Sequence, residues 1–187
     1  TSNIKNSYRL GAELSAGWSP LQWLSLEGNA ALSQNKLKNF TEEVEAWDTE
    51  AVHNTYAKST LSYSPSAILN GFVDVHFGGF SATWHTNFVS RQYLDNTQFE
   101  ARSLPRYSTT AIRLSYTLKP GKNAIGMKQT VFGLDLNNIF NRHFAQSGWV
   151  YSSVVPDYGF TEDNRYYQIG YIPSAGFNLM GNVTVSF

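Results

Sequence analysis

Cysteine is absent from this sequence of 187 residues. Disulfide bonds, thiolate metal sites and a cysteine nucleophile are therefore excluded. Charged residues make up only 15% of the chain and their signs cancel to a net charge of +0, whereas ordinary soluble domains carry about 25% charged residues. A chain without net positive charge does not attract the phosphate backbone of nucleic acid, so no nucleic-acid partner is predicted.

Long hydrophobic runs are also missing. No apolar stretch approaches the roughly 18 residues that a membrane-spanning helix requires. The first ten residues, TSNIKNSYRL, lack the charged-then-apolar order of a signal peptide. If the protein is secreted or inserted in a membrane, we therefore expect this sequence to be that of the mature protein or of one part of a longer chain.

Aromatic residues, by contrast, are abundant at 15% of the chain. They occur in segments where every second residue is apolar, as in the final stretch GFNLMGNVTVSF. This alternation is typical of a β-strand with one apolar and one polar face. About seven such segments are present, each close to the roughly ten residues that a tilted strand needs to cross a bilayer; they span residues 7–18, 23–33, 67–77, 80–88, 107–118, 130–140 and 176–187.

The polar face distinguishes a membrane barrel from a soluble β-sandwich. It carries mostly Ser, Thr, Gly and Asn rather than the many Lys, Glu and Arg of a solvent-facing sheet. The apolar face carries almost no charge, as expected for lipid contact, although a dry sandwich core would look the same. The residues thus favour a transmembrane β-barrel and leave a soluble β-sandwich binding module as an alternative.

The connections between these segments alternate between short and long. Pro and Gly indicate short turns at 19–22, 78–79 and 119–127, and these alternate with long links at about 34–60, 90–106 and 141–174. Short periplasmic turns opposite long extracellular loops are typical of an outer-membrane barrel. Seven strands would place the two chain ends on opposite sides of the membrane, whereas bacterial single-chain barrels have an even strand number. We therefore expect an incomplete barrel, the C-terminal piece of a larger protein.

Four stretches resemble the TonB-dependent outer-membrane receptors: NKLKNFTEEVEAWDT, SRQYLDNTQ, VFGLDLNNIFNRHF and YIPSAGFNLMGNVTVSF. Phe177 is a departure, because many members carry Arg there. The resemblance, closer to the siderophore, haem and cobalamin branch, implies that residues 1–187 are the C-terminal part of a 22-stranded all-β antiparallel meander. It also implies a plug domain, the remaining strands and a TonB-binding segment elsewhere in the same chain, and TonB-energised uptake of a small scarce ligand such as an iron-siderophore. The implied location is the outer membrane of a Gram-negative bacterium, in contact with its lipid.

The resemblance further assigns roles to residues of the last strand. In this family a terminal Phe preceded by alternating apolar residues is the signal that the outer-membrane assembly machinery reads. Here that signal falls on Phe177, Val183, Val185 and Phe187. The same residues also form an ordinary wall strand, and the two roles are compatible.

Other candidate residues follow from strand parity and loop position. Polar-face side chains predicted to contact the plug are Glu27, His76, His85, Arg113 and Asp135. Aromatic residues of the link at 141–174 predicted to lie on the ligand side are Trp149, Tyr151, Tyr158, Tyr166 and Tyr167. The acidic run Glu42, Glu43, Glu45, Asp48 and Glu50 could bind a cation or simply be solvated.

Catalytic, cofactor and metal sites are not predicted. The four histidines show no HxH or HExxH spacing, and neither a Ser/His/Asp order nor a glycine-rich phosphate loop is evident. The sequence therefore does not indicate an enzyme. A further alternative is a closed eight-stranded outer-membrane barrel that serves as an anchor or adhesin, which would require one more strand near the N-terminus.

Overall fold

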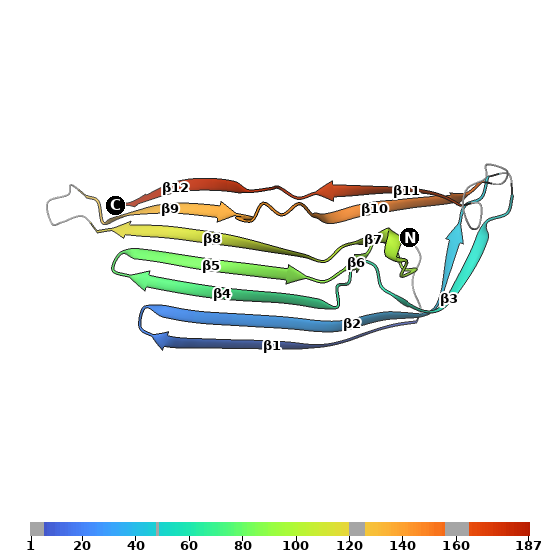
Figure 1. Ribbon diagram of the computed structural model, residues 1–187, viewed down its shortest axis with the longest axis horizontal. Coiled ribbons are helices and arrows are strands. Elements are labelled where there is room, and N and C mark those ends of the chain that lie inside the picture. The colour runs from blue at the N-terminus through green and yellow to red at the C-terminus, as the bar shows by residue number, and fades with distance from the viewer. Residues whose placement is uncertain (1–5, 48, 120–125, 156–164) are drawn as a thin grey trace.

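The computed structural model describes residues 6–47, 49–119, 126–155 and 165–187. It consists almost entirely of β-strands in antiparallel pairs (Figure 1), which confirms the predicted fold class. The described part of the chain contains no helix long and apolar enough to span a membrane. The elements are β1 Ser7–Leu21, β2 Leu24–Val44, β3 Val52–Thr60, β4 Ala67–Phe77, β5 Phe80–Val89, β6 Gln92–Tyr93, the 3-10 helix η1 Glu100–Arg102, β7 Ser103–Leu104, β8 Tyr107–Leu118, β9 Gln129–Asn137, β10 Ala145–Val154, β11 Arg165–Pro173 and β12 Asn178–Ser186.

The main sheet is an eight-stranded antiparallel meander. Its continuous path runs β1-β2-β4-β5-β8-β9-β12, and β3 joins it by pairing with β2. The strands of this path are those that the alternation predicted, because each of the seven predicted segments falls on one of them. Figure 1 shows the sheet as a single layer whose long strands lie side by side.

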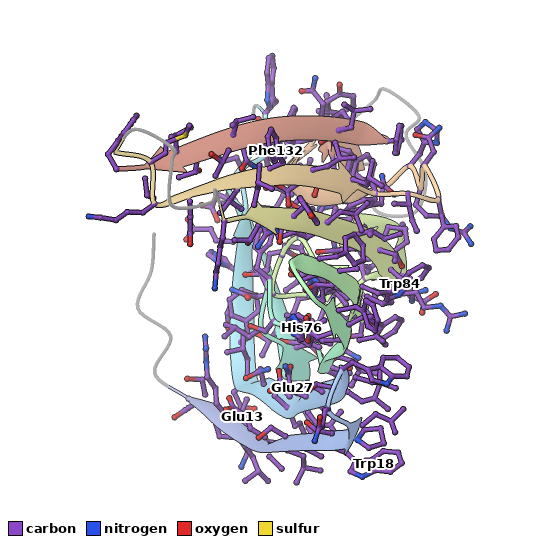
Figure 2. The ribbon with its side chains drawn as sticks, turned by 90° about the vertical axis from the view of Figure 1, so that its left-hand side faces the viewer. Glu13, Trp18, Glu27, His76, Trp84 and Phe132 are labelled. Carbon is purple, nitrogen blue, oxygen red and sulfur yellow. The ribbon has the colours of Figure 1, made fainter. Side chains whose placement is uncertain are left out.

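The register places most apolar strand positions on one side of this sheet, although Phe72, which pairs with Glu27 and His85, lies on the other side. Val73 on β4 lies opposite Leu26 on β2 and opposite Trp84 on β5. Because directly paired residues point to the same side of a sheet, these positions form one continuous surface, which we call the apolar face. Figure 2 shows Trp18 and Trp84 on the convex side of the curved sheet, whereas Glu27 and His76 lie on the concave side, the polar face.

The apolar face is uncovered within the described residues. Trp18, Phe77 and Val183 keep 66%, 76% and 61% of their surface exposed. A soluble β-sandwich would bury this face under a second sheet, and no such sheet lies over it in the described residues (Figures 1 and 2). The sandwich alternative is therefore wrong for this fold.

The two outermost strands are not joined to each other. Among the described residues β1 pairs with β2, and β12 pairs with β9, so each keeps one unpaired edge. The sheet is consequently an open trough, and the alternative of a closed eight-stranded barrel is not what this chain forms. Unpaired edges are rarely left free in native proteins, because their backbone groups pair readily with another strand.

The β1–β2 and β4–β5 connections lie at the same end of the trough, the end at which the C-terminus lies (Figure 1). The β4–β5 hairpin is closed by Gly78 and Gly79, because Phe77 pairs with Phe80. Gly78 has a φ of 60°, a left-handed conformation that glycine adopts without steric cost. The β1–β2 turn falls at Gln22 and Trp23, slightly later than predicted.

The long links are not the open loops that the sequence predicted. The link at 34–60 continues β2 to Val44 and returns as β3, the link at 90–106 contains β6, η1 and β7, and the link at 141–174 contains the β10–β11 hairpin. The alternation did not reveal these strands, because segments such as NKLKNFTEEV carry polar residues on both faces. We call residues 34–60, 90–106 and 141–173 the hairpin tier.

The small hydrophobic core lies in and next to this hairpin tier. Its buried side chains are Leu37, Val44, Val89, Leu94 and Leu104. Backbone hydrogen bonds connect the separate hairpins, from the amide of Trp47 to the carbonyl oxygen of Val154 at 3.0 Å and from Val154 to Glu45 at 2.9 Å. These hydrogen bonds join the hairpins into one connected structure, which lies at the end of the sheet opposite the short turns (Figure 1).

Candidate functional site

The polar face presents the side chains that were predicted to contact a plug. Glu27 and His76 are exposed on the concave side (Figure 2), and neither side chain has a hydrogen-bond partner among the described residues. They lie on the neighbouring antiparallel strands β2 and β4, and their exposed side chains are available to a second surface. The structure holds no such surface, and their role as plug contacts stays a prediction.

Arg113 and Asp135 form an ion pair on the polar face. They are directly opposite on β8 and β9, and the Arg113 Nε donates to Asp135 Oδ1 at 2.6 Å. The Arg113 side chain is 76% exposed. Exposed pairs of this kind contribute only about 0–1 kcal/mol to stability, so the pair offers both charges to a partner rather than holding the sheet together.

His85 belongs to a row of polar side chains that crosses β2, β4 and β5. Its Nε2 lies 3.0 Å from the Oδ1 of Asn70, which also accepts a hydrogen bond from Asn87 at 2.9 Å. Asn70 in turn donates to Asn29 at 2.9 Å. The His85 ring stacks on Phe72 with centroids 4.3 Å apart. The structure thus restrains His85, whereas it leaves His76 free.

A buried group of charges lies in the hairpin tier, and the sequence did not predict it. The Glu42 Oε1 is 2.6 Å from the Arg165 Nη2 and 3.5 Å from the Arg102 Nη1. Arg102 also lies 3.1 Å from the Asp95 Oδ2. The two arginine side chains are only 3% and 4% exposed. The four residues, which we call the charge cluster, come from β2, the β6–η1 segment, η1 and β11.

Aromatic rings and hydroxyl groups complete the charge cluster. Tyr56 donates from its hydroxyl to Glu42 Oε2 at 3.1 Å, and Thr97 accepts from Arg102 Nη2 at 2.8 Å. The Tyr167 ring lies 5.0 Å from the Arg102 guanidinium and 5.3 Å from that of Arg165. Cation–π contacts of this kind are stronger when the cation is desolvated, as it is here.

The environment of the charge cluster shifts two pKa values. Burial, followed by the adjacent Glu42 carboxylate, raises the pKa of the Tyr56 phenol above 10.0. For Arg165, burial lowers the pKa, but the hydrogen bond and charge of Glu42 outweigh it and raise the pKa overall. The two arginines share the Glu42 carboxylate, which lies 2.6 Å from Arg165 and 3.5 Å from Arg102. The Nε atoms of Arg102 and Arg165 are both buried and have no hydrogen-bond partner within the part of the chain that the structure describes.

The acidic run at 42–50 is thus divided by the fold. Glu42 turns inward to the arginines, whereas Glu43, Glu45 and Glu50 are exposed. Asp48 lies outside the described residues. No group of three His, Asp or Glu in the described residues is arranged to hold a metal ion. The sequence could not pair Glu42 with Arg102 or Arg165, because no local pattern connects residues so far apart.

The aromatic residues predicted for the ligand side lie on the β10–β11 hairpin. Trp149, Tyr151 and Tyr166 share one face, because Tyr151 pairs with Gln168 and Ser153 pairs with Tyr166. Trp149 and Tyr151 are exposed. Tyr167 is on the opposite face, over the charge cluster, and Tyr158 lies outside the described residues.

The residues of the predicted assembly signal lie along the apolar face of the last strand. Val183 lies opposite Phe132, and Val185 lies opposite Thr130. Phe177 and Phe187, at the two ends of β12, are 49% and 75% exposed. The other edge of β12 is unpaired among the described residues. An apolar strand with one open edge fits the predicted role, which the structure does not test.

Comparison with known proteins places this arrangement in a structural context. No protein-family model matches this sequence, and no curated protein matches it. Among solved structures, the fold is similar to the ferric yersiniabactin uptake receptor FyuA from Yersinia pestis, with a TM-score of 0.55 and 15% sequence identity. The similarity covers 97% of this chain and 24% of that chain, so this chain spans about a quarter of the receptor's length. At this identity the likeness shows a shared fold: the chain has the fold of one portion of a β-barrel receptor.

Proposed function

We propose that this chain is the C-terminal wall portion of a TonB-dependent outer-membrane receptor that imports a scarce ligand such as an iron-siderophore, haem or cobalamin. The observation that carries the proposal is the match of nearly the whole chain to part of a ferric-siderophore uptake receptor. The resemblance of the four sequence stretches quoted above to the TonB-dependent receptors also supports it. The chain itself catalyses no reaction under this proposal.

The uncovered apolar face supports a membrane location. Contiguous exposed apolar surfaces larger than a few hundred Å² mark contacts with a membrane or another protein. Here the surface spans every strand of the continuous path β1-β2-β4-β5-β8-β9-β12. It carries aromatic residues near the short turns, namely Trp18, Phe77, Phe80, Tyr116 and Phe187. Aromatic girdles at the bilayer interfaces are typical of outer-membrane barrels. The short turns would then face the periplasm and the hairpin tier the outside.

The open edges of β1 and β12 support a larger barrel. Lipid does not tolerate unpaired backbone groups, so both edges need partner strands. We propose that the remaining strands of the full-length chain pair with them, and that the plug domain of the same chain fills the trough. Glu27, His76, His85, Arg113 and Asp135 would then form polar contacts with the plug.

The hairpin tier provides the proposed ligand side. Trp149 and Tyr151 are exposed on one face of β10–β11 and are available to stack on a ligand, whereas Tyr167 is engaged by the charge cluster. TonB would act through the N-terminal part of the receptor, and the assembly machinery would read the last strand.

Uptake assays of the full-length receptor test the proposal. Cells that express the receptor are given radiolabelled ferric siderophores, haem and cobalamin, with and without an intact TonB. We expect at least one ligand to accumulate only when TonB is present. Accumulation that is independent of TonB, or recovery of the receptor as a water-soluble protein without detergent, would contradict the proposal.

A further inference from the structure

A cavity opens where the main sheet meets the hairpin tier. It has a volume of about 770 Å³ and lies between the end of β5, the start of β8 and the segment that leads into β10. Four aromatic residues, Phe88, Tyr107, Phe144 and Tyr171, form part of its wall. The rings of Tyr107 and Phe144 stack with centroids 4.3 Å apart. The wall is therefore apolar and held in place by packing.

The same cavity is lined by three basic side chains, Arg106, Arg142 and His143, and no described lining residue is acidic. All three are exposed, and none of these side chains forms a hydrogen bond or ion pair with the described residues. The other arginines of the hairpin tier behave differently, because Arg91 is paired with Glu100, and Arg102 and Arg165 belong to the charge cluster. The cavity thus has uncompensated positive charge beside an apolar wall.

The cavity lies next to the apolar face. Phe88, which lines the cavity, pairs with Leu69 on β4 and with Ser108 on β8. Leu69 and Trp84 lie on the apolar face, so Phe88 lies on the same face. A second cavity of about 480 Å³ is lined by His85, Asn137 and Asn178 of the polar face. Phe144 lines both cavities. Phe144 thus separates the polar face from the basic cavity, which lies at the level where the hairpin tier begins.

We propose that the basic cavity binds the phosphorylated headgroup of a membrane lipid of the outer leaflet. The guanidinium groups of Arg106 and Arg142 suit phosphate, because arginine offers paired N–H donors to its oxygens. The acyl chains would lie along the apolar face beside Phe88. An anionic amphiphile matches both properties of the site, its unpaired positive charge and its adjoining apolar surface. The inference rests on the proposed function in that the apolar face contacts a membrane and the hairpin tier lies on the outer side of that membrane.

Lipid binding to the purified full-length receptor in detergent tests this inference. Native mass spectrometry measures the affinity for diphosphorylated lipid A, for zwitterionic phosphatidylethanolamine and for inorganic phosphate. We expect the receptor to prefer diphosphorylated lipid A. The Arg106→Gln, Arg142→Gln double variant should bind it at least about tenfold more weakly, because each hydrogen bond to a charged group contributes enough for such a factor.

A matched double variant, Arg91→Gln with Lys58→Gln, removes the same charge from the same end of the chain outside the cavity. Its lipid affinity should equal that of the unaltered receptor. An equal loss in both double variants, or no loss in either, would overturn the inference. Binding of inorganic phosphate as tight as that of the lipid would also overturn it, because the site would then recognise free phosphate.

The remaining outcomes separate this inference from the proposed function. If the cavity variant keeps its lipid affinity but no longer binds the imported ligand, the cavity belongs to the ligand path and the lipid inference is wrong. If lipid selectivity and its loss in the cavity variant are observed while uptake proves independent of TonB, the lipid inference stands and the proposed function fails.

Discussion

The Glu42 carboxylate on β2 lies 2.6 Å from the Arg165 guanidinium on β11, and both side chains are largely withdrawn from solvent. This ion pair joins the first long hairpin of the tier to the last one. Arg102 of η1 lies on the same carboxylate, so three separate hairpins meet at one acidic group. Glu42 therefore joins the three hairpins through side-chain contacts, in addition to the backbone hydrogen bonds between Trp47, Val154 and Glu45.

Replacing Glu42 by Gln should loosen the hairpin tier. The substitution leaves two buried guanidinium groups without their shared anion, and removal of one partner from a buried ion pair costs about 3–5 kcal/mol. Hydrogen exchange of the backbone amides in β10, β11 and the β6–β7 segment should increase, while the main sheet stays protected. The exposed neighbour Glu43 provides the control, because Glu43→Gln should leave exchange unchanged. Equal protection in both variants would contradict the role of the charge cluster.

Alkaline pH should weaken the same tier through Tyr56. Its pKa is raised above 10.0 by burial and by Glu42, so the folded chain holds the phenolic proton more tightly than the unfolded chain. This contribution to stability is fully present below pH 10 and is lost as the pH rises through the raised pKa. Thermal unfolding of the tier, followed from about pH 9 upwards, should show a smaller alkaline loss in Tyr56→Phe. An identical pH profile in that variant would show that the Tyr56 proton does not contribute.

A charge on the apolar face should prevent membrane insertion. Leu134 shares this face with Leu114 and Gly181, and arginine near the bilayer midplane costs about 2–4 kcal/mol. Leu134→Arg should therefore lower the amount of receptor in the outer-membrane fraction. Asp135→Asn, one residue away on the polar face, should insert normally. If both variants insert equally well, the assignment of the two faces is wrong.

Deletion of Phe187 should reduce assembly of the receptor. The residue ends the apolar row of β12 and is 75% exposed, so its loss should disturb recognition rather than packing within this chain. Surface labelling of the receptor measures the assembled amount. Ser186→Ala changes the neighbouring polar position and should have no effect. An unchanged amount of receptor at the cell surface after the deletion would contradict the interpretation of Phe187 as part of an assembly signal.

The local sequence was sufficient to predict the strands of the continuous path in the main sheet, although not β3. Alternation with a period of two residues identified every strand of the continuous path and the face that each side chain occupies, as the pairing of Val73 with Trp84 confirms. Such alternation is a property of neighbouring residues, so it can be read without knowing the fold. The division into short turns at one end and long links at the other was equally visible, because Gly and Pro define tight turns locally.

The hairpin tier was decided by tertiary structure. Its strands carry polar residues on both faces and pack against other hairpins. No alternation of apolar and polar residues therefore identifies these strands in the sequence. The inward position of Glu42, the placement of Tyr167 over two guanidinium groups and the basic cavity at Arg106 and Arg142 all depend on segments that are distant in the chain. Sequence alone determined which side of the sheet is apolar, because that requires only strand geometry. Which charges meet above the sheet required the packed structure, because the hairpins acquire their neighbours only when the whole chain has folded.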